Sequence, residues 1–222
     1  MIHEINLLWI LSLVFFLFFL IREFVAYKRK LPLKYFFTPS LTMLLVIMAI
    51  LSIAIYGADR YRSMITLSLL MALAADTQLM IEETNLMING AVFFIIGHIF
   101  YLVAFSDNMT FESWNIAIIA VLAVINLIFF RILFKSAGKR AIPAVFYILI
   151  LDLVVYFAIA RLNVAISSSA ILAASGAVLF MISDYILLTN AFIISIPKST
   201  VFTWQFYAPA QYLIVLSTFV LI

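Results

Sequence analysis

The sequence contains no cysteine and few charged residues, and each shortage excludes a class of protein. Without cysteine the chain has no disulfide, no thiolate metal site and no cysteine nucleophile. Only 10% of its 222 residues are charged, whereas 68% are hydrophobic and the mean hydropathy is +1.26. This leaves too little polar surface for a soluble globule, so the composition predicts a polytopic membrane protein. The net charge of +3 is too small to indicate a nucleic-acid partner.

Long apolar runs recur along the chain, and about eight of them approach the roughly 20 residues that a helix needs to cross a bilayer. We therefore expect an all-α fold, with residues 1–222 as a single domain and about eight transmembrane helices in one bundle. The first run has no basic residue before it and no small-residue cleavage motif after it, so we interpret it as a retained helix and not as a signal peptide. The expected spans are Ile5–Ile21, Tyr35–Tyr56, Ser63–Ile81, Leu86–Phe105, Trp114–Phe130, Ile142–Ala160, Ser167–Leu188 and Val201–Ile222.

Basic residues cluster in the loops that follow the odd-numbered spans, which hold ten of the 13 Lys and Arg residues. By the positive-inside rule these loops face the cytoplasm, so both termini are expected on the other side of the membrane. We find no organelle-targeting segment and expect a bacterial cytoplasmic membrane. The ten residues are Arg22, Lys28, Arg29, Lys30, Lys34, Arg131, Lys135, Lys139, Arg140 and Lys198, and the other three are Arg60, Arg62 and Arg161.

The stretch 175–192 is apolar apart from one carboxylate, Asp184, in its middle. A charged side chain near the centre of a bilayer costs roughly 2.5–3.5 kcal/mol on insertion scales, so such a residue is a candidate functional group. Asp76, near the end of the third span, is a second candidate. Both carboxylates are expected toward the cytoplasmic ends of their helices, facing one cavity.

Other polar residues fall at a similar depth in two further spans. His98 and Tyr101 are three residues apart and Tyr207 and Gln211 are four apart, so each pair lies on one helical face. We expect these four side chains to line the same cavity as the two carboxylates.

Several other residues within the spans are expected to be structural. Asp152 falls toward the other leaflet, with Tyr147 and Tyr156 nearby, and is expected to tie helices together. The small residues expected at close helix contacts are Gly90, Ala91, Gly176 and Ala177.

Four short motifs occur in order along the chain. They are Ala-Asp-x-x-Leu-Met at 75–80, Gly90 with Phe94, Gly97, His98 and Tyr101, Gly176-Ala177 with Phe180, Ser183, Asp184 and Leu187, and Tyr207-x-x-Ala-Gln-x-Leu-Ile at 207–214. Together they resemble the YhhN-like lysoplasmalogenase family of multi-pass membrane proteins. The resemblance covers the chain from about the second span to its end.

The chain differs from the usual pattern of that family at two positions. The family usually has Gly before the first Asp and Lys before the Pro of the second span, whereas this sequence has Ala75 and Thr38 there. If that Lys holds the substrate phosphate, Lys34, one helical turn earlier, is a candidate to replace it. Lys34 and Thr38 are therefore candidate substrate-binding residues.

The resemblance implies hydrolysis of the vinyl ether bond of a lysoplasmalogen, a lysophospholipid, to a fatty aldehyde and a glycerophospho-base. Such a bond is cleaved by protonating its β-carbon, after which water adds to the oxocarbenium ion and the hemiacetal collapses. Two carboxyl groups in a cavity of low dielectric can divide this work, one as the acid and the other as the anion. Asp76 and Asp184 are the candidate pair, in either order. The candidates for orienting the water or the ether oxygen are His98, Tyr101, Tyr207 and Gln211.

No cofactor is expected for this chemistry, and His3 and His98 alone do not suggest a metal site. Membrane lipids are the other expected partners, and the oligomeric state is left open. Intramembrane Asp and His residues also suit a proton-coupled transporter or a protein that only binds lipid. Against transport, Pro39, Pro143 and Pro209 lie in the first turns of their spans and do not mark broken helices.

Overall fold

The computed structural model describes residues 2–81, 86–107, 109–163 and 166–220. In these ranges the chain forms eight α-helices and two short 3-10 helices, Gly138–Ala141 and Arg161–Asn163, and no strand. The predicted all-α fold is therefore confirmed. The α-helices are α1 (Ile2–Tyr27), α2 (Leu31–Tyr56), α3 (Arg60–Leu79), α4 (Met87–Phe105), α5 (Asn115–Ala137), α6 (Ile142–Ala160), α7 (Ser168–Phe192) and α8 (Ser199–Ser217).

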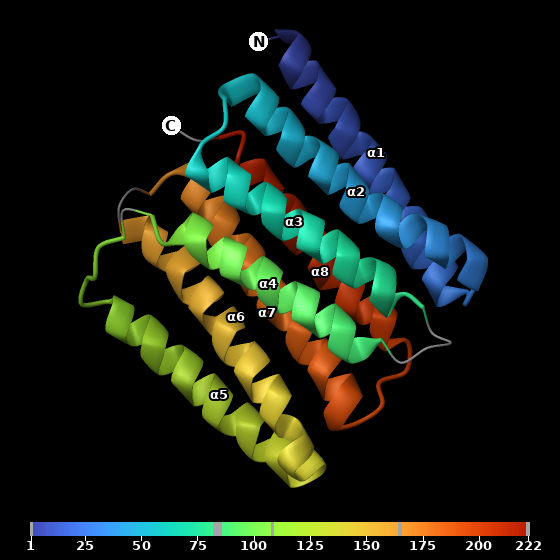
Figure 1. The fold of residues 1–222 in the computed structure, drawn as a ribbon, viewed down its shortest axis with the longest axis vertical. Coiled ribbons are helices and arrows are strands. Elements are labelled where there is room, and N and C mark those ends of the chain that lie inside the picture. Colours follow the sequence, from blue (N-terminus) through green and yellow to red (C-terminus); the bar gives the residue numbers. More distant parts are fainter. Residues whose placement is uncertain (1, 82–85, 108, 164–165, 221–222) are drawn as a thin grey trace.

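Successive helices run in opposite directions, so α1 begins and α8 ends at the same end of the bundle (Figure 1). The last helix, α8, packs most extensively on α7 and also touches α1, α2 and α3. In contrast, α5 packs against α6 and α7 at the edge of the bundle (Figure 1). Because α8 contacts the first three helices, polar residues from both halves of the chain meet in the interior.

Five segments are long and apolar enough to cross a membrane: Leu7–Tyr27, Leu31–Tyr56, Met87–Phe105, Asn115–Asn163 and Ser168–Phe192. The segment Asn115–Asn163 contains both α5 and α6, whereas α3 and α8 are not among the five. Both of these helices carry polar residues that other helices cover, which lowers their hydropathy. The chain is thus a membrane protein with several spanning helices, and the count of about eight spans is not confirmed.

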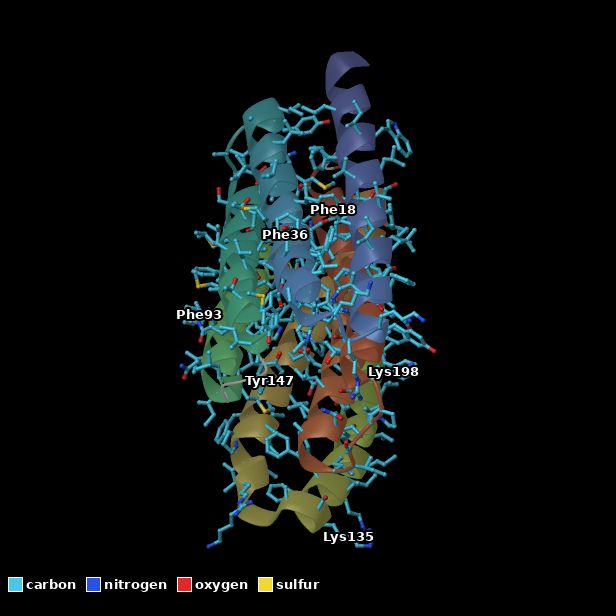
Figure 2. The ribbon with its side chains drawn as sticks, turned by 90° about the vertical axis from the view of Figure 1, so that its right-hand side faces the viewer. Phe18, Phe36, Phe93, Lys135, Tyr147 and Lys198 are labelled. Carbon is cyan, nitrogen blue, oxygen red and sulfur yellow. The ribbon has the colours of Figure 1, made fainter. Side chains whose placement is uncertain are left out.

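The outer surface of the bundle is apolar, as expected for helices that face lipid. On α1, Trp9 and Leu13 are 71% and 72% exposed, and on α5 Leu127 is 76% exposed. Exposed apolar area of this extent is rare on soluble proteins. Figure 2 shows Lys135 at one end of the bundle and Lys198 toward the same end, away from the start of α1.

Helices approach closely at two glycines, and one of them is Gly176, where α7 meets α8. A Cβ atom at Gly176 would lie 2.7 Å from the carbonyl oxygen of Ala210, a distance that real Cβ atoms do not adopt. At Gly90 it would lie 2.5 Å from Cγ of Leu79, where α4 meets α3. The prediction that these two glycines mark close helix contacts is confirmed.

Candidate active site

A cavity of about 150 Å³ lies at the end of the bundle where α1, α3 and α7 end and α2 and α8 begin. Figure 1 shows the end of α1, the start of α2, the end of α3 and the start of α8 together at the right of the view. The cavity therefore receives side chains from both halves of the chain. Its polar and charged side chains include Arg22, Lys34, Thr38, Asp76, Ser183, Asp184, Thr203 and Tyr207.

Asp76 is buried at the last full turn of α3 and is bonded to two neighbouring helices. Its Oδ2 accepts a hydrogen bond from Oγ1 of Thr42 on α2 at 2.6 Å and another from the hydroxyl of Tyr207 on α8 at 2.8 Å. Hydroxyl donors stabilise a carboxylate and fix its orientation. This carboxyl group therefore links α3 to α2 and α8.

Asp184 lies on α7, lines the same cavity and is 2% exposed. Its Oδ2 accepts a hydrogen bond from the hydroxyl of Tyr147 on α6 at 2.5 Å. Tyr147 lies in the half of the bundle that also holds Lys198 (Figure 2). The sequence suggested Tyr147 as a neighbour of Asp152, but its hydroxyl group faces Asp184. The two carboxyl groups, 108 positions apart in sequence, line one cavity.

His98, Tyr101 and Gln211 are buried but are not among the described residues that line this cavity. The hydroxyl of Tyr101 donates to Oε1 of Gln211, linking α4 to α8. The His98 ring packs 5.1 Å from that of Phe180 and 5.3 Å from that of Tyr147, centroid to centroid. Tyr101 and Gln211 thus bond to each other, while His98 packs on Tyr147, the partner of Asp184. The expected orienting role of these residues stays a prediction.

With this geometry in place, comparison with known proteins identifies the family. The sequence model of the YhhN family matches residues 33–218. The chain belongs to the YhhN family. The match covers most of the chain and confirms the resemblance drawn from the four motifs. No curated protein and no solved structure matches the chain.

In this YhhN family member, both candidate substrate-binding residues of α2 reach the cavity. Lys34 is 5% exposed and Thr38 is 2% exposed, and both line the cavity. The Oγ1 atom of Thr38 is buried without a hydrogen-bond partner among the described residues. The same holds for Oγ of Ser183 and Oγ1 of Thr203. Buried polar atoms are normally bonded, so their gathering at one cavity indicates a polar ligand or water.

Arg22 is the main site residue that the sequence analysis of this YhhN protein missed. It was assigned to the loop after the first span, as an orientation signal, but it lies within α1 and is 0% exposed. The adjacent pair Arg22-Glu23 interrupts the apolar run and therefore resembled a span boundary. The helix continues to Tyr27, which places the guanidinium group in the cavity wall. Of the ten basic residues counted for orientation, Arg22 and Lys34 line the cavity.

Asp152 of this YhhN protein belongs to a separate polar cluster. Its Oδ2 accepts a hydrogen bond from Nδ2 of Asn126 on α5 at 2.5 Å, and Oδ1 of Asn126 accepts one from the hydroxyl of Tyr185 at 2.6 Å. This cluster joins α5, α6 and α7 outside the cavity. Over the part of the chain that is described, no three His, Asp or Glu residues are grouped as a metal site would require.

Proposed function

We propose that this YhhN family member is a membrane hydrolase that cleaves the vinyl ether bond of a lysoplasmalogen. The observation that carries the proposal is the meeting of Asp76 and Asp184, from α3 and α7, in one buried cavity. Carboxyl groups inside a membrane bundle are costly, and they mark functional sites. Family membership supports the same class of reaction.

The chemistry assigns different roles to the two carboxyl groups. Asp76 accepts two hydroxyl hydrogen bonds, which favour its anionic form, whereas Asp184 accepts one. In the proposed reaction Asp184 gives its proton to the β-carbon of the vinyl ether, and the double-bond electrons form that C–H bond. The resulting oxocarbenium ion is stabilised by the Asp76 anion nearby.

Water then adds to the α-carbon of the oxocarbenium ion. One carboxylate takes a proton from this water, which gives a hemiacetal. Collapse of the hemiacetal breaks the carbon–oxygen bond to the glycerol, releases the fatty aldehyde and leaves the glycerol oxygen protonated. The balance is one water consumed, with no oxidant, reductant or metal among the reactants.

A second, apolar cavity supports a lipid substrate. It has a volume of about 170 Å³ and lies between α4, α6 and α7. It shares Leu79, Phe94 and Leu187 with the polar cavity, and Tyr147, the partner of Asp184, is in its wall. A polar cavity that shares part of its wall with an apolar one suits an amphiphile with its scissile bond between the two. The hydrocarbon chain of the substrate is assigned to the apolar cavity.

The proposed setting is a single domain whose eight α-helices all cross the bilayer, with both termini outside the cytoplasm of a bacterial cell. In this orientation the polar cavity opens toward the cytoplasmic side. The basic residues Lys28, Arg29, Lys30 and Lys198 lie at that end of the chain's helices, consistent with the positive-inside rule.

The experiment that tests the proposal is aldehyde release by purified protein in detergent, with a lysoplasmalogen as substrate. The matched lysolipid with an ester in place of the vinyl ether serves as the control and is expected to stay intact. A hydrolase works without a sealed membrane, whereas a proton-coupled transporter does not act on its cargo chemically. Absence of aldehyde from well-folded protein would contradict the proposed reaction.

A further inference from the structure

The guanidinium group of Arg22 is fully buried in the wall of the polar cavity. Its Nη1 atom donates to Oε1 of Glu23 at 2.5 Å and to the carbonyl oxygen of Thr200 at 3.4 Å. The group also lies over the ring of Trp204, 4.2 Å from the ring centroid. These contacts hold the plane of the guanidinium group in one orientation.

The opposite edge of the same group has no hydrogen-bond partner in the part of the chain that the structure describes. Nε and Nη2 of Arg22 are both buried, and neither donates a hydrogen bond to any described residue. Leaving a buried charged donor without a hydrogen bond is costly, so such donors normally face a ligand or water. The Nε–Nη2 edge presents two parallel N–H groups, the arrangement that binds two oxygens of a phosphate or carboxylate.

Other groups around this edge also favour an anion. Lys34 lines the same cavity, and so do Ser199 and Thr200 in the first turn of α8. The N-terminus of a helix carries partial positive charge, which attracts anions. The cavity that holds the two carboxyl groups is thus also lined by Arg22, by Lys34 and by the N-terminus of α8.

We propose that the Nε–Nη2 edge of Arg22 binds the phosphate of the lysophospholipid, with Lys34 as the second cation. This inference rests on the proposed function for the class of lipid, but it concerns a residue outside the segment that matches the family. Arg22 lies on α1, before the residues 33–218 that match the family. Arg22 and Lys34 are near the helix ends, whereas Asp184 lies about two turns inside α7, so the phosphate sits outermost and the ether bond deeper.

The consequence is selectivity for lipids that carry a phosphate. A neutral lipid of the same chain, which has a hydroxyl in place of the phosphate, leaves the Nε–Nη2 edge unbonded. Hydrogen bonds to charged groups contribute enough that we expect at least a 10-fold preference for the phospholipid. Arg22 is therefore a specificity-determining residue of the site.

Binding can be measured without turnover, because Trp204 stacks on Arg22. The chain has three Trp residues, and replacing Trp9 and Trp114, which are both exposed, by Phe leaves Trp204 as the only Trp. Its fluorescence is titrated with oleoyl-lysophosphatidylethanolamine, with monooleoylglycerol and with inorganic phosphate. We expect the lysophospholipid to bind at least 10-fold more tightly than monooleoylglycerol, and inorganic phosphate to bind far more weakly than either lipid.

The test compares Arg22→Gln and Arg22→Lys with a matched control, Arg29→Gln, at an exposed position near the same end of α1. We expect Arg22→Gln to lose most of the preference for the phospholipid, Arg22→Lys to keep a larger part of it, and Arg29→Gln to match the parent. If Arg22→Gln does not fold, the preference measured in Arg22→Lys tests the inference. Binding of monooleoylglycerol then shows that the site of this variant is intact. An unchanged preference in both Arg22 variants overturns the inference, and so does equal binding of the two lipids by the parent protein.

Failure of this inference and failure of the proposed function have different signatures. Hydrolysis of a lysoplasmalogen by a protein whose phosphate preference does not depend on Arg22 overturns the inference alone. An Arg22-dependent preference in a protein that releases no aldehyde supports the inference and contradicts the proposed reaction. Equal binding of inorganic phosphate and lysophospholipid would assign the edge to free phosphate and overturn the lipid assignment.

Discussion

The hydroxyl of Tyr207 lies 2.8 Å from Oδ2 of Asp76 and holds α8 against the carboxyl group of α3. The ring of the same residue packs against those of Phe180 and Trp204, at centroid distances of 5.3 and 4.9 Å. One side chain therefore joins the aromatic interior of the bundle to the candidate catalytic cavity. Because the ring and the hydroxyl have separate contacts, their contributions can be separated by mutation.

Tyr207→Phe is expected to lower kcat for lysoplasmalogen by about 10-fold or more while leaving the protein folded. The substitution removes one of two hydrogen bonds to the proposed anion, and a hydrogen bond to a charged group is worth about 1.5–3 kcal/mol. The ring contacts remain. Tyr212→Phe, on the same helix but outside the cavity lining, is the matched control and should retain full activity. Equal activity in both variants would contradict the role given to the Tyr207 hydroxyl.

The proposed protonation of the vinyl ether predicts a specific isotope pattern. In D₂O the aldehyde should carry one deuterium on the carbon next to its carbonyl, because that carbon receives the proton of the acid. Rapid reduction of the aldehyde to the alcohol prevents later exchange, and mass spectrometry gives the label. An unlabelled product would exclude β-carbon protonation as the route.

The α7–α8 contact predicts that Gly176→Ala destabilises the protein. Adding a methyl group 2.7 Å from the carbonyl oxygen of Ala210 forces the two helices apart, and overpacking typically costs about 1–3 kcal/mol. Gly97→Ala is the matched control, since its Cβ would have 3.3 Å to the nearest atom. Thermal unfolding in detergent should show a clearly larger decrease for Gly176→Ala. The reverse order would show that the two helices are not in such close contact.

The proposed orientation predicts where reporters at the two ends are active. A reporter that works only in the cytoplasm should be silent at the C-terminus and active in the loop after α1, near Arg29. The reason is that α1 begins and α8 ends at the same end of the bundle, opposite the cluster of basic residues. A cytoplasmic signal from the C-terminus would reverse the proposed topology.

Much of the fold was predictable from the apolar runs, because each run falls on one of the eight helices. The observed bounds of α4 and α6 agree with the predicted spans within a residue, whereas α1 and α7 continue past their predicted ends. In α1 the charged pair Arg22-Glu23 indicated a boundary. Hydropathy cannot reveal that a buried partner and a cavity allow a charged residue inside a helix.

The two carboxyl groups were predictable as candidates because an Asp in an apolar run is costly. Their convergence on one cavity depends on how α3, α7 and α8 pack, which no local pattern specifies. The same applies to Tyr147, since its hydroxyl points to Asp184 on another helix, not along its own helix to Asp152. Thr42, the second donor to Asp76, has no distinguishing feature in the sequence.

The measurement that tests the central claim most directly is aldehyde release by purified Asp76→Asn and Asp184→Asn variants, beside the unmodified protein. The matched control is Asp152→Asn, which changes a third carboxyl group inside the bundle that bonds Asn126 outside the cavity. We expect turnover to be abolished in both cavity variants and retained in the folded Asp152 variant. Full activity in either the Asp76 or the Asp184 variant would contradict the two-carboxylate account.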